Sequence, residues 1–194
     1  MIIHLIRHGY TNANEQKCYC GRTDLPLSQE GIARLQALKA QGAYPYAAAF
    51  YTSGMLRALQ TLTVIYGDVK ASSIAELAEY DFGVFEMRSH NELQYDPAYI
   101  AWIADETEDV ACPGGECKRQ YRHRVMSGFS LLLFDIQRKD LTSVSVVIHG
   151  GTIVEIMSRL FPGEKDFYTW QPSPGLGYTL CRNRNELFTY QPIH

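Results

Sequence analysis

Short apolar runs alternate along this chain with segments in which apolar residues recur every three or four positions. Apolar runs predict buried strands at 2–7, 47–51 and 143–148. Helical spacing predicts helices from Ser28 to about Gln41, from Met55 to Tyr66, from Glu116 to Arg138, and after Gly151 to about Leu160. Weaker signals indicate a strand near 71–75, short helices near 89–95 and 97–104, and a closing hairpin of 176–181 and 186–191 around Asn183–Asn185.

This alternation of strands and helices predicts an α/β fold, a three-layer α/β/α sandwich with a largely parallel central sheet. A length of 194 residues is typical of one domain, so we interpret 1–194 as a single unit. The segment at about 80–115 is irregular and too long for a simple connection. We interpret it as a helical insertion that covers the functional site and forms one of its walls.

Composition narrows the classes of partner. The net charge of −3 offers no basic field for nucleic acid or for an anionic membrane, so neither is expected as a partner. No apolar run approaches the roughly 18–20 residues of a membrane span. The N-terminus lacks the pattern of a secretory leader, which makes the cytoplasm the expected location. An anion site in this chain must therefore be local, built from a few converging cationic side chains.

The five cysteines do not form a disulfide framework by their number or spacing. They are Cys18, Cys20, Cys112, Cys117 and Cys181. An odd count in a chain of this length favours reduced thiols. The first two and the next two could meet as a metal site, but neither pair has the usual C-x-x-C spacing, so no metal is expected.

Two predicted strands end in the same way. Arg7-His8-Gly9 follows the first strand, and His149-Gly150-Gly151 follows the strand at 143–148. If these strands are parallel neighbours, both imidazoles face one pocket at the sheet edge where ligands bind. The helix after the second histidine directs free N–H groups to the same place. Arg57, one turn into its helix, points to that edge as well, although a lone histidine or arginine in such a position is more often structural.

Six motifs in order now define a resemblance. They are Arg7-His-Gly-Tyr-Thr-Asn-Ala-Asn14, Gly21-Arg-Thr-Asp-Leu-Pro-Leu-Ser28 with Gly31, Ser53 to Thr61, Leu77-Ala-Glu-Tyr-Asp-Phe-Gly83 with Glu86, Pro113-Gly-Gly-Glu116, and His149-Gly150. The chain resembles the histidine phosphatase superfamily, in its phosphoglycerate-mutase-like branch. The resemblance spans residues 4 to about 152 and departs from the family pattern at Tyr10 and Met87.

The resemblance implies a role for each motif residue. Arg7, Arg57 and His149 hold the phosphoryl oxygens with help from Asn14, and they stabilise the charge that these oxygens carry in the transition state. His8 is the nucleophile and forms a phosphohistidine. A backbone carbonyl that accepts from its other ring nitrogen would select the required tautomer.

The remaining roles concern the leaving group and the rim of the site. Glu79 protonates the leaving oxygen and then activates water. Cys20, Gly21 and Gly150 contact substrate or phosphate, and no cofactor or metal is implied. Glu116, at the start of the long helix, either contacts substrate or favours the helix N-terminus by its charge. His149 is expected to be a donor, with a charged imidazole as a hypothesis.

Three functions stay open at this point. The first is a metal-independent phosphatase acting on a small phosphorylated metabolite. Small family members include α-ribazole-phosphate phosphatases of cobalamin synthesis and broad-specificity phosphatases, and Asp81-Phe-Gly83 and Pro113–Glu116 are compatible with the former. The second is a phosphoglycerate mutase, although 84–115 contain only Arg88 as a fixed cation. The third is a catalytically silent phospho-ligand module. The assembly is a monomer or a homodimer.

Overall fold

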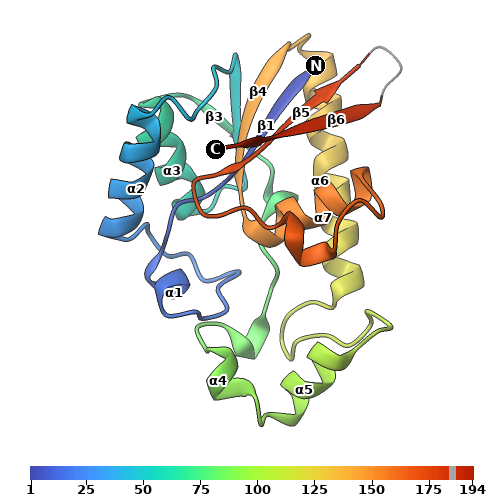
Figure 1. The fold of residues 1–194 in the computed structure, drawn as a ribbon. Helices are drawn as coiled ribbons and strands as arrows, with labels where there is room; N and C mark the ends of the chain where they lie inside the picture. The colour runs from blue at the N-terminus through green and yellow to red at the C-terminus, as the bar shows by residue number, and fades with distance from the viewer. Residues whose placement is uncertain (184–186) are drawn as a thin grey trace.

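The computed structural model describes residues 1–183 and 187–194, and its centre is one six-stranded sheet in the order β3-β2-β4-β1-β5-β6 (Figure 1). The strands are β1 (Ile2–Arg7), β2 (Ala49–Thr52), β3 (Ala71–Ser73), β4 (Ser143–Ile148), β5 (Gly177–Arg182) and β6 (Phe188–Ile193). The first four of them pair in parallel, whereas β5 and β6 run antiparallel at one edge. The largely parallel sheet is confirmed.

Helices cover both faces of this sheet, which confirms the three-layer sandwich (Figure 1). On one face lie α2 (Gln29–Ala40) and α3 (Leu56–Tyr66), which pack on Ile6 and Val147. On the other lie α6 (Lys118–Arg138) and α7 (Gly150–Leu160), which pack on Ile3 and Leu5. Side chains of a strand alternate between faces, so adjacent residues of β1 serve the two separate cores.

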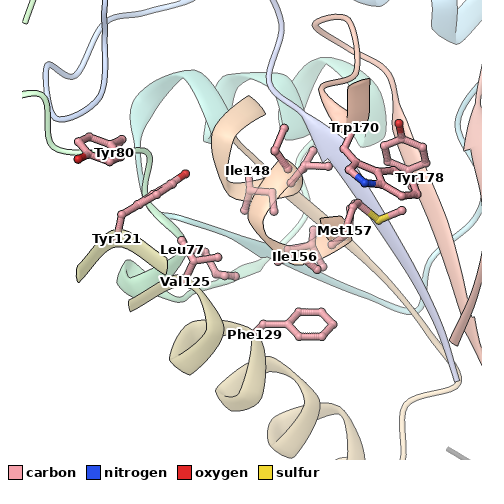
Figure 2. Close-up of a cluster of buried hydrophobic side chains, with 14 of the residues drawn as sticks. Leu77, Tyr80, Tyr121, Val125, Phe129, Ile148, Ile156, Met157, Trp170 and Tyr178 are labelled. Atoms are coloured by element: carbon pink, nitrogen blue, oxygen red, sulfur yellow. The ribbon is translucent and has the colours of Figure 1, made fainter. Parts of the chain in front are cut away.

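The core beneath α6 is the larger one. Figure 2 shows Tyr121, Val125 and Phe129 along one side of α6, facing Leu77 and the α7 residue Ile156. This is the helical stripe expected from an amphipathic pattern, and each of these side chains is buried. Its tyrosine lies at the end of the helix nearest the carboxyl edge of the sheet, so this packing also positions a polar group at the functional site.

The segment at 80–115 leaves the sheet and forms a separate small lobe (Figure 1). It contains the 3-10 turn η2 (Gly83–Phe85) and the helices α4 (His90–Leu93) and α5 (Pro97–Ala104), and the turn η1 (Ala75–Leu77) leads into it. Aromatic rings, not helix length, hold this lobe together: Phe85 contacts both Tyr99 and Trp102.

Some boundaries differ from the sequence prediction for local reasons. The long helix begins at Lys118 because Cys117 is its N-cap. β2 begins and ends later than predicted, and the final strand is Phe188–Ile193 instead of 186–191. The expected turn around Asn183–Asn185 falls partly outside the described residues. The helix α1 (Asn12–Glu15) and the turn η3 (Phe167–Trp170) were not predicted, because neither has apolar periodicity over more than one turn. No described helix is long and apolar enough to span a membrane.

Candidate active site

The ends of β1 and β4 bring two histidines together. β1 and β4 pair in parallel with Arg7 opposite Ile148, so the next residue of each strand is a histidine at the same edge. The rings of His8 and His149 meet edge to face, with centroids 5.2 Å apart. The two strands are therefore parallel neighbours, and both histidines lie at the same edge of the sheet.

His8 is held as a neutral imidazole in a defined tautomer. Its Nδ1 lies 2.7 Å from the carbonyl oxygen of Gly9, so Nδ1 carries the proton and Nε2 keeps a free lone pair. Burial, with the positive charges of Arg57 and Arg7 nearby, holds the pKa of His8 well below its usual 6.5. The geometry therefore provides a nucleophilic nitrogen at neutral pH.

Arg57 is fully buried among carbonyl groups. Its Nη1 donates to the carbonyl of Thr23 at 3.0 Å and its Nη2 to that of Gly21 at 2.7 Å, while Nε reaches Nδ1 of His149 at 3.3 Å. Each terminal nitrogen has two hydrogens, so one N–H on each remains for a ligand. The buried guanidinium is therefore oriented beside both histidines before any ligand binds.

His149 differs from the hypothesis of a charged imidazole. Its Nδ1 accepts from Arg57, so the proton sits on Nε2, which donates to the hydroxyl of Ser53 at 2.7 Å. Burial and the charge of Arg57 hold its pKa well below 6.5, so the ring is neutral. Both ring nitrogens are engaged, and direct donation to a phosphoryl oxygen requires one of these bonds to be exchanged.

Arg7 carries a donor that has no protein partner. Its Nη1 donates to the carbonyl of Pro172 at 2.8 Å, but its buried Nε has no hydrogen-bond partner among the described residues. A Cβ placed on Gly150 would lie 3.0 Å from that Nε, so glycine leaves the nitrogen room there. Burial lowers the pKa of Arg7 from its usual range, and the charge of Glu79 opposes that shift. A buried, unpaired cationic donor of this kind suits an anionic ligand.

Glu79 is fixed on the opposite side by three donors. Its Oε1 accepts from the hydroxyl of Tyr121 at 2.6 Å and from the backbone of Tyr80 at 2.9 Å. Its Oε2 accepts from the N–H of Gly151 at 2.9 Å, in the first turn of α7. A Cβ on that glycine would come within 2.5 Å of the carboxylate. The glycine after the second histidine therefore makes room for Glu79.

A cavity of about 880 Å³ opens beside this carboxylate. Its lining includes Glu79 and Gly151 at one end, together with Cys20 and Gln171. His8 is 5 % exposed and lies deeper than these residues. Arg7, His8, Arg57 and His149 do not belong to the described lining of this cavity, and Glu79 and Gly151 connect it to the end of α7 at which His149 lies.

The loop at 20–24 is held by a single carboxylate. Glu86 accepts from the backbone N–H groups of Gly21, Arg22 and Thr23 at 2.9–3.2 Å. The same loop supplies the two carbonyls that bind Arg57. Glu86 thus positions Arg57 through the loop between them.

Replacing Glu86 with glutamine is expected to lower the free energy of unfolding by about 1–3 kcal/mol, because the new amide presents N–H groups to backbone donors. Urea unfolding measures the change. Glu30→Gln is the matched control, since Glu30 pairs with Arg34 on the surface and its loss is expected to cost less than about 0.5 kcal/mol. Equal losses of unfolding free energy in both variants would contradict the role of Glu86 in holding the 20–24 loop.

Other expected site residues have mainly structural contacts. Asn14 completes the capping box of α1, whose N-cap is Thr11: its Oδ1 accepts from the backbone and the hydroxyl of Thr11, which leaves its amide nitrogen as a donor. Cys20 lines the cavity, and burial raises the pKa of its thiol, so the thiol is protonated at neutral pH. No described group of three or more His, Cys, Asp or Glu side chains could hold a metal.

Three rim residues lie away from the cavity lining. The ring of Tyr10 packs under the guanidinium of Arg34 at 4.8 Å. Glu116 precedes α6 as expected, and its carboxylate binds Arg124 at 2.5 Å and the backbone N–H of Asp81 in the insertion. Met87 has a φ of +60°, a left-handed backbone conformation that glycine adopts more readily than methionine.

Sequence reasoning missed several residues that support the site. Tyr121 belongs to the apolar stripe of α6, yet its hydroxyl binds Glu79. Ser53 binds His149, and the hydroxyl of Thr61 connects the backbone of Gly9 to that of Arg57. Ser53 and Thr61 are the first and last residues of one motif, so their positions in that motif could have identified them. Nothing in the sequence showed that the hydroxyl of a tyrosine in the apolar stripe of α6 would reach the functional site.

The site histidines His8 and His149, and the buried His4 of β1, whose pKa is also lowered by burial, predict how stability changes with pH. Their folded pKa values lie below the unfolded value of 6.5, so the unfolded chain takes up protons that the folded chain does not. The free energy of unfolding should therefore fall as pH drops below about 6.5, by up to about 1.4 kcal/mol per pH unit for each histidine. Urea unfolding at pH 7.5 to 5 should give a shallower slope for His8→Asn. An identical slope in both proteins would contradict the prediction.

Comparison with known proteins gives a consistent result. A family model described as the histidine phosphatase superfamily (branch 1) matches residues 3–182. The adenosylcobalamin/alpha-ribazole phosphatase of Escherichia coli (strain K12) is 31 % identical over 164 residues, which cover 82 % of this chain and 79 % of that protein. A 2,3-bisphosphoglycerate-dependent phosphoglycerate mutase of Parvibaculum lavamentivorans is 25 % identical over 177 residues, with the same coverage of each chain. The crystal structure of the alpha-ribazole phosphatase from Shigella flexneri has a TM-score of 0.86 and 27 % identity, and the match covers 100 % of this chain and 96 % of that one.

Proposed function

The chain belongs to the histidine phosphatase superfamily, branch 1, and on this premise we propose that it is a metal-independent phosphatase that hydrolyses a small phosphomonoester through a phosphohistidine. The observation that carries the proposal is the buried, neutral His8, whose Nδ1 is fixed by a backbone carbonyl and whose Nε2 is free. The positive charges of Arg57 and Arg7 act on this ring, and the charge of Glu79 acts on Arg7.

The first step forms an N–P bond from Nε2 of His8 and breaks the P–O bond to the leaving group. The unpaired Nε of Arg7 and the remaining N–H groups of Arg57 bind the phosphoryl oxygens. In a loose transition state the charge gathers on these oxygens, so the buried donors stabilise it. The electron pair of the broken bond leaves on the substrate oxygen.

That oxygen takes a proton from Glu79. Oε2 accepts only the Gly151 N–H among the described donors, so it keeps a lone pair on which the proton is carried. In the second step the carboxylate takes a proton from water, whose oxygen attacks phosphorus. The N–P bond breaks, inorganic phosphate is released, and His8 returns to its neutral state.

For the substrate we propose α-ribazole 5′-phosphate. The support is that the alpha-ribazole phosphatases of the comparison match this chain over most or all of its length. The cavity beside Glu79 is also large enough for a riboside, because ligand sites of about 300–1,000 Å³ hold molecules of that size.

Phosphoglycerate mutase is the second candidate, and the charges around the cavity disfavour it. A mutase must bind a carboxylate as well as the phosphoryl group. The two cations in the described lining are Lys118 and Arg122, and both are engaged. Lys118 donates to the carbonyl of Asp105 at 2.7 Å, and Arg122 binds Glu108 with both terminal nitrogens. Arg122 is neutralised by this ion pair, so one cation of the described lining, Lys118, is left to balance the charge of a second anionic group.

A panel of phosphomonoesters tests the proposal. We expect metal-independent release of phosphate from α-ribazole 5′-phosphate, and hydrolysis of 3-phosphoglycerate to exceed phosphoryl transfer. Transfer in excess of hydrolysis would identify a mutase. No turnover and no phosphoenzyme with any member of the panel would leave the silent binding module as the function.

A further inference from the structure

The chain after the η3 turn runs along Arg7 and is fixed there at several points. The N–H of Arg7 donates to the carbonyl of Leu176 at 2.9 Å, and the N–H of Gly175 donates to the carbonyl of Arg7 at 3.0 Å. The carbonyl of Pro172 accepts from Nη1 of the same arginine at 2.8 Å. The segment 171–176 therefore has a defined position beside Arg7, and its side chains start from a fixed backbone.

Gln171 begins this segment, directly after Trp170, which is fully buried. Its backbone N–H donates to the carbonyl of Tyr168 at 3.1 Å, which closes the turn. Its side chain belongs to the lining of the cavity beside Glu79. Neither polar atom of this side chain has a hydrogen-bond partner among the described residues. The amide therefore contributes no polar contact to the fold, and its two N–H groups are available to a ligand.

The amide nitrogen of Gln171 lies close to the unpaired donor of Arg7. A Cβ placed on Gly150 would be 2.7 Å from Nε2 of Gln171 and 3.0 Å from Nε of Arg7. The two nitrogens thus border the same spot beside Gly150, and neither has a hydrogen-bond partner in the part of the chain that the structure describes. Two donors cannot satisfy each other, so the group that pairs with both is an acceptor.

The state of His149 leaves room for a further donor at this place. A phosphoryl group has three oxygens with several lone pairs, which accept from more donors than one arginine supplies. Both ring nitrogens of His149 already bind Arg57 and Ser53, so the ring has no free N–H. Arg7 contributes the unpaired N–H of its Nε. An uncharged amide beside it adds donors where the second histidine offers none.

We propose that the side-chain amide of Gln171 donates a hydrogen bond to a phosphoryl oxygen, next to Nε of Arg7, and is a further catalytic residue of the site. The inference rests on the proposed function, because it takes the bound group to be a phosphoryl group. The contact transfers no proton: it stabilises charge on an oxygen that is present in the substrate, in the transition state and in inorganic phosphate. Gln171 therefore acts on the phosphoryl group, whatever the leaving group is.

Binding of inorganic phosphate tests the contact without turnover. Equilibrium dialysis with ³²P-labelled phosphate at neutral pH measures the Kd of the wild type and of each variant. Gln171→Ala should raise Kd about ten- to hundredfold, the range for a hydrogen bond to a charged group. Gln171→Glu keeps the length and the acceptor oxygens but loses the donor, so its Kd should rise at least as much. Ser173→Ala, an exposed change in the same segment, is the control and should stay within about twofold of wild type.

Steady-state rates test the assignment to the phosphoryl group. Gln171→Ala should lower kcat/KM about ten- to hundredfold, and by a similar factor for every phosphomonoester of the panel. A loss confined to substrates with one kind of leaving group would overturn the proposal, because it would place the amide on the leaving group. Urea unfolding without phosphate should match wild type, since the side chain has no polar partner to lose among the described residues. A lower free energy of unfolding in both Gln171 variants would mean a structural role instead.

The outcomes separate this inference from the proposed function. Weaker phosphate binding in Gln171→Ala, with no hydrolysis of any phosphomonoester by the wild type, would support the amide contact and reject the phosphatase. Hydrolysis at the wild-type rate in Gln171→Ala would reject the amide contact alone. Unchanged phosphate binding in Gln171→Ala, or retained binding in Gln171→Glu, would also overturn the inference. No binding of phosphate by the wild type would overturn both.

Discussion

Replacing His8 with alanine is expected to lower kcat at least about 10⁴-fold, because no other group at the site can form the covalent intermediate. His149 cannot substitute for it, since its two ring nitrogens are bound to Arg57 and Ser53. The measurement is steady-state phosphate release on the best substrate of the panel, with protein folding checked by urea unfolding.

The same variant tests the intermediate directly. Wild type mixed with a ³²P-labelled substrate and quenched in alkaline denaturant should retain label on the protein, and acid should release that label. His8→Ala should retain none. Ser53→Ala is the control: it removes a partner of the second histidine but leaves the nucleophile, so its phosphoenzyme should still form. Undiminished label in His8→Ala would reject the assignment of the nucleophile.

Glu79→Gln should reduce kcat about 10²–10⁴-fold on alkyl phosphates, because the leaving alkoxide loses its proton donor. Glutamine retains a carbonyl that can accept from Tyr121 or Gly151, so the change is chemical more than steric. The rate of the first step should fall much less with p-nitrophenyl phosphate, because its leaving group departs without a proton. The second step still lacks its base, so phosphoenzyme should accumulate as a burst.

The matched control is Glu106→Gln, which alters another carboxylate in the cavity lining that is exposed and farther along it. Its kcat on alkyl phosphates should stay within about twofold of wild type. An equal loss with alkyl and nitrophenyl substrates in Glu79→Gln, and no burst, would mean that Glu79 supports the structure of the site and transfers no proton.

Periodicity was a good guide wherever one face of an element is buried over several turns. The stripe through Tyr121, Val125 and Phe129 predicted α6, because a helix that buries such a face repeats it every three or four residues. α1 and η3 were missed because one turn contains too few residues to show a period. The first is stabilised by its capping box, and the second by ring contacts of Trp170 with Tyr178 of β5 and Tyr190 of β6.

The functional site also has some features that the sequence predicts and others that only the fold decides. That His8 and His149 meet was predictable from two similar strand ends, because parallel neighbours end at one edge of a sheet. The neutral state of His149 was not predictable, because it depends on burial and on the approach of Arg57. Choosing Glu79 among several acidic residues needed the resemblance, and only the fold shows the three donors that hold it.

By itself, then, the sequence determined the strands, the long helices, their alternation and the chemical groups at the strand ends. These follow from local patterns, in which the residues that must act together are near one another in the chain. The tertiary structure alone decided the tautomer of His8, the unpaired donor of Arg7, the hydrogen bonds of Glu86 to the 20–24 loop and the ring contact between Phe82 and Trp102. Each of these depends on contacts and desolvation between segments far apart in the chain, and no local pattern records them.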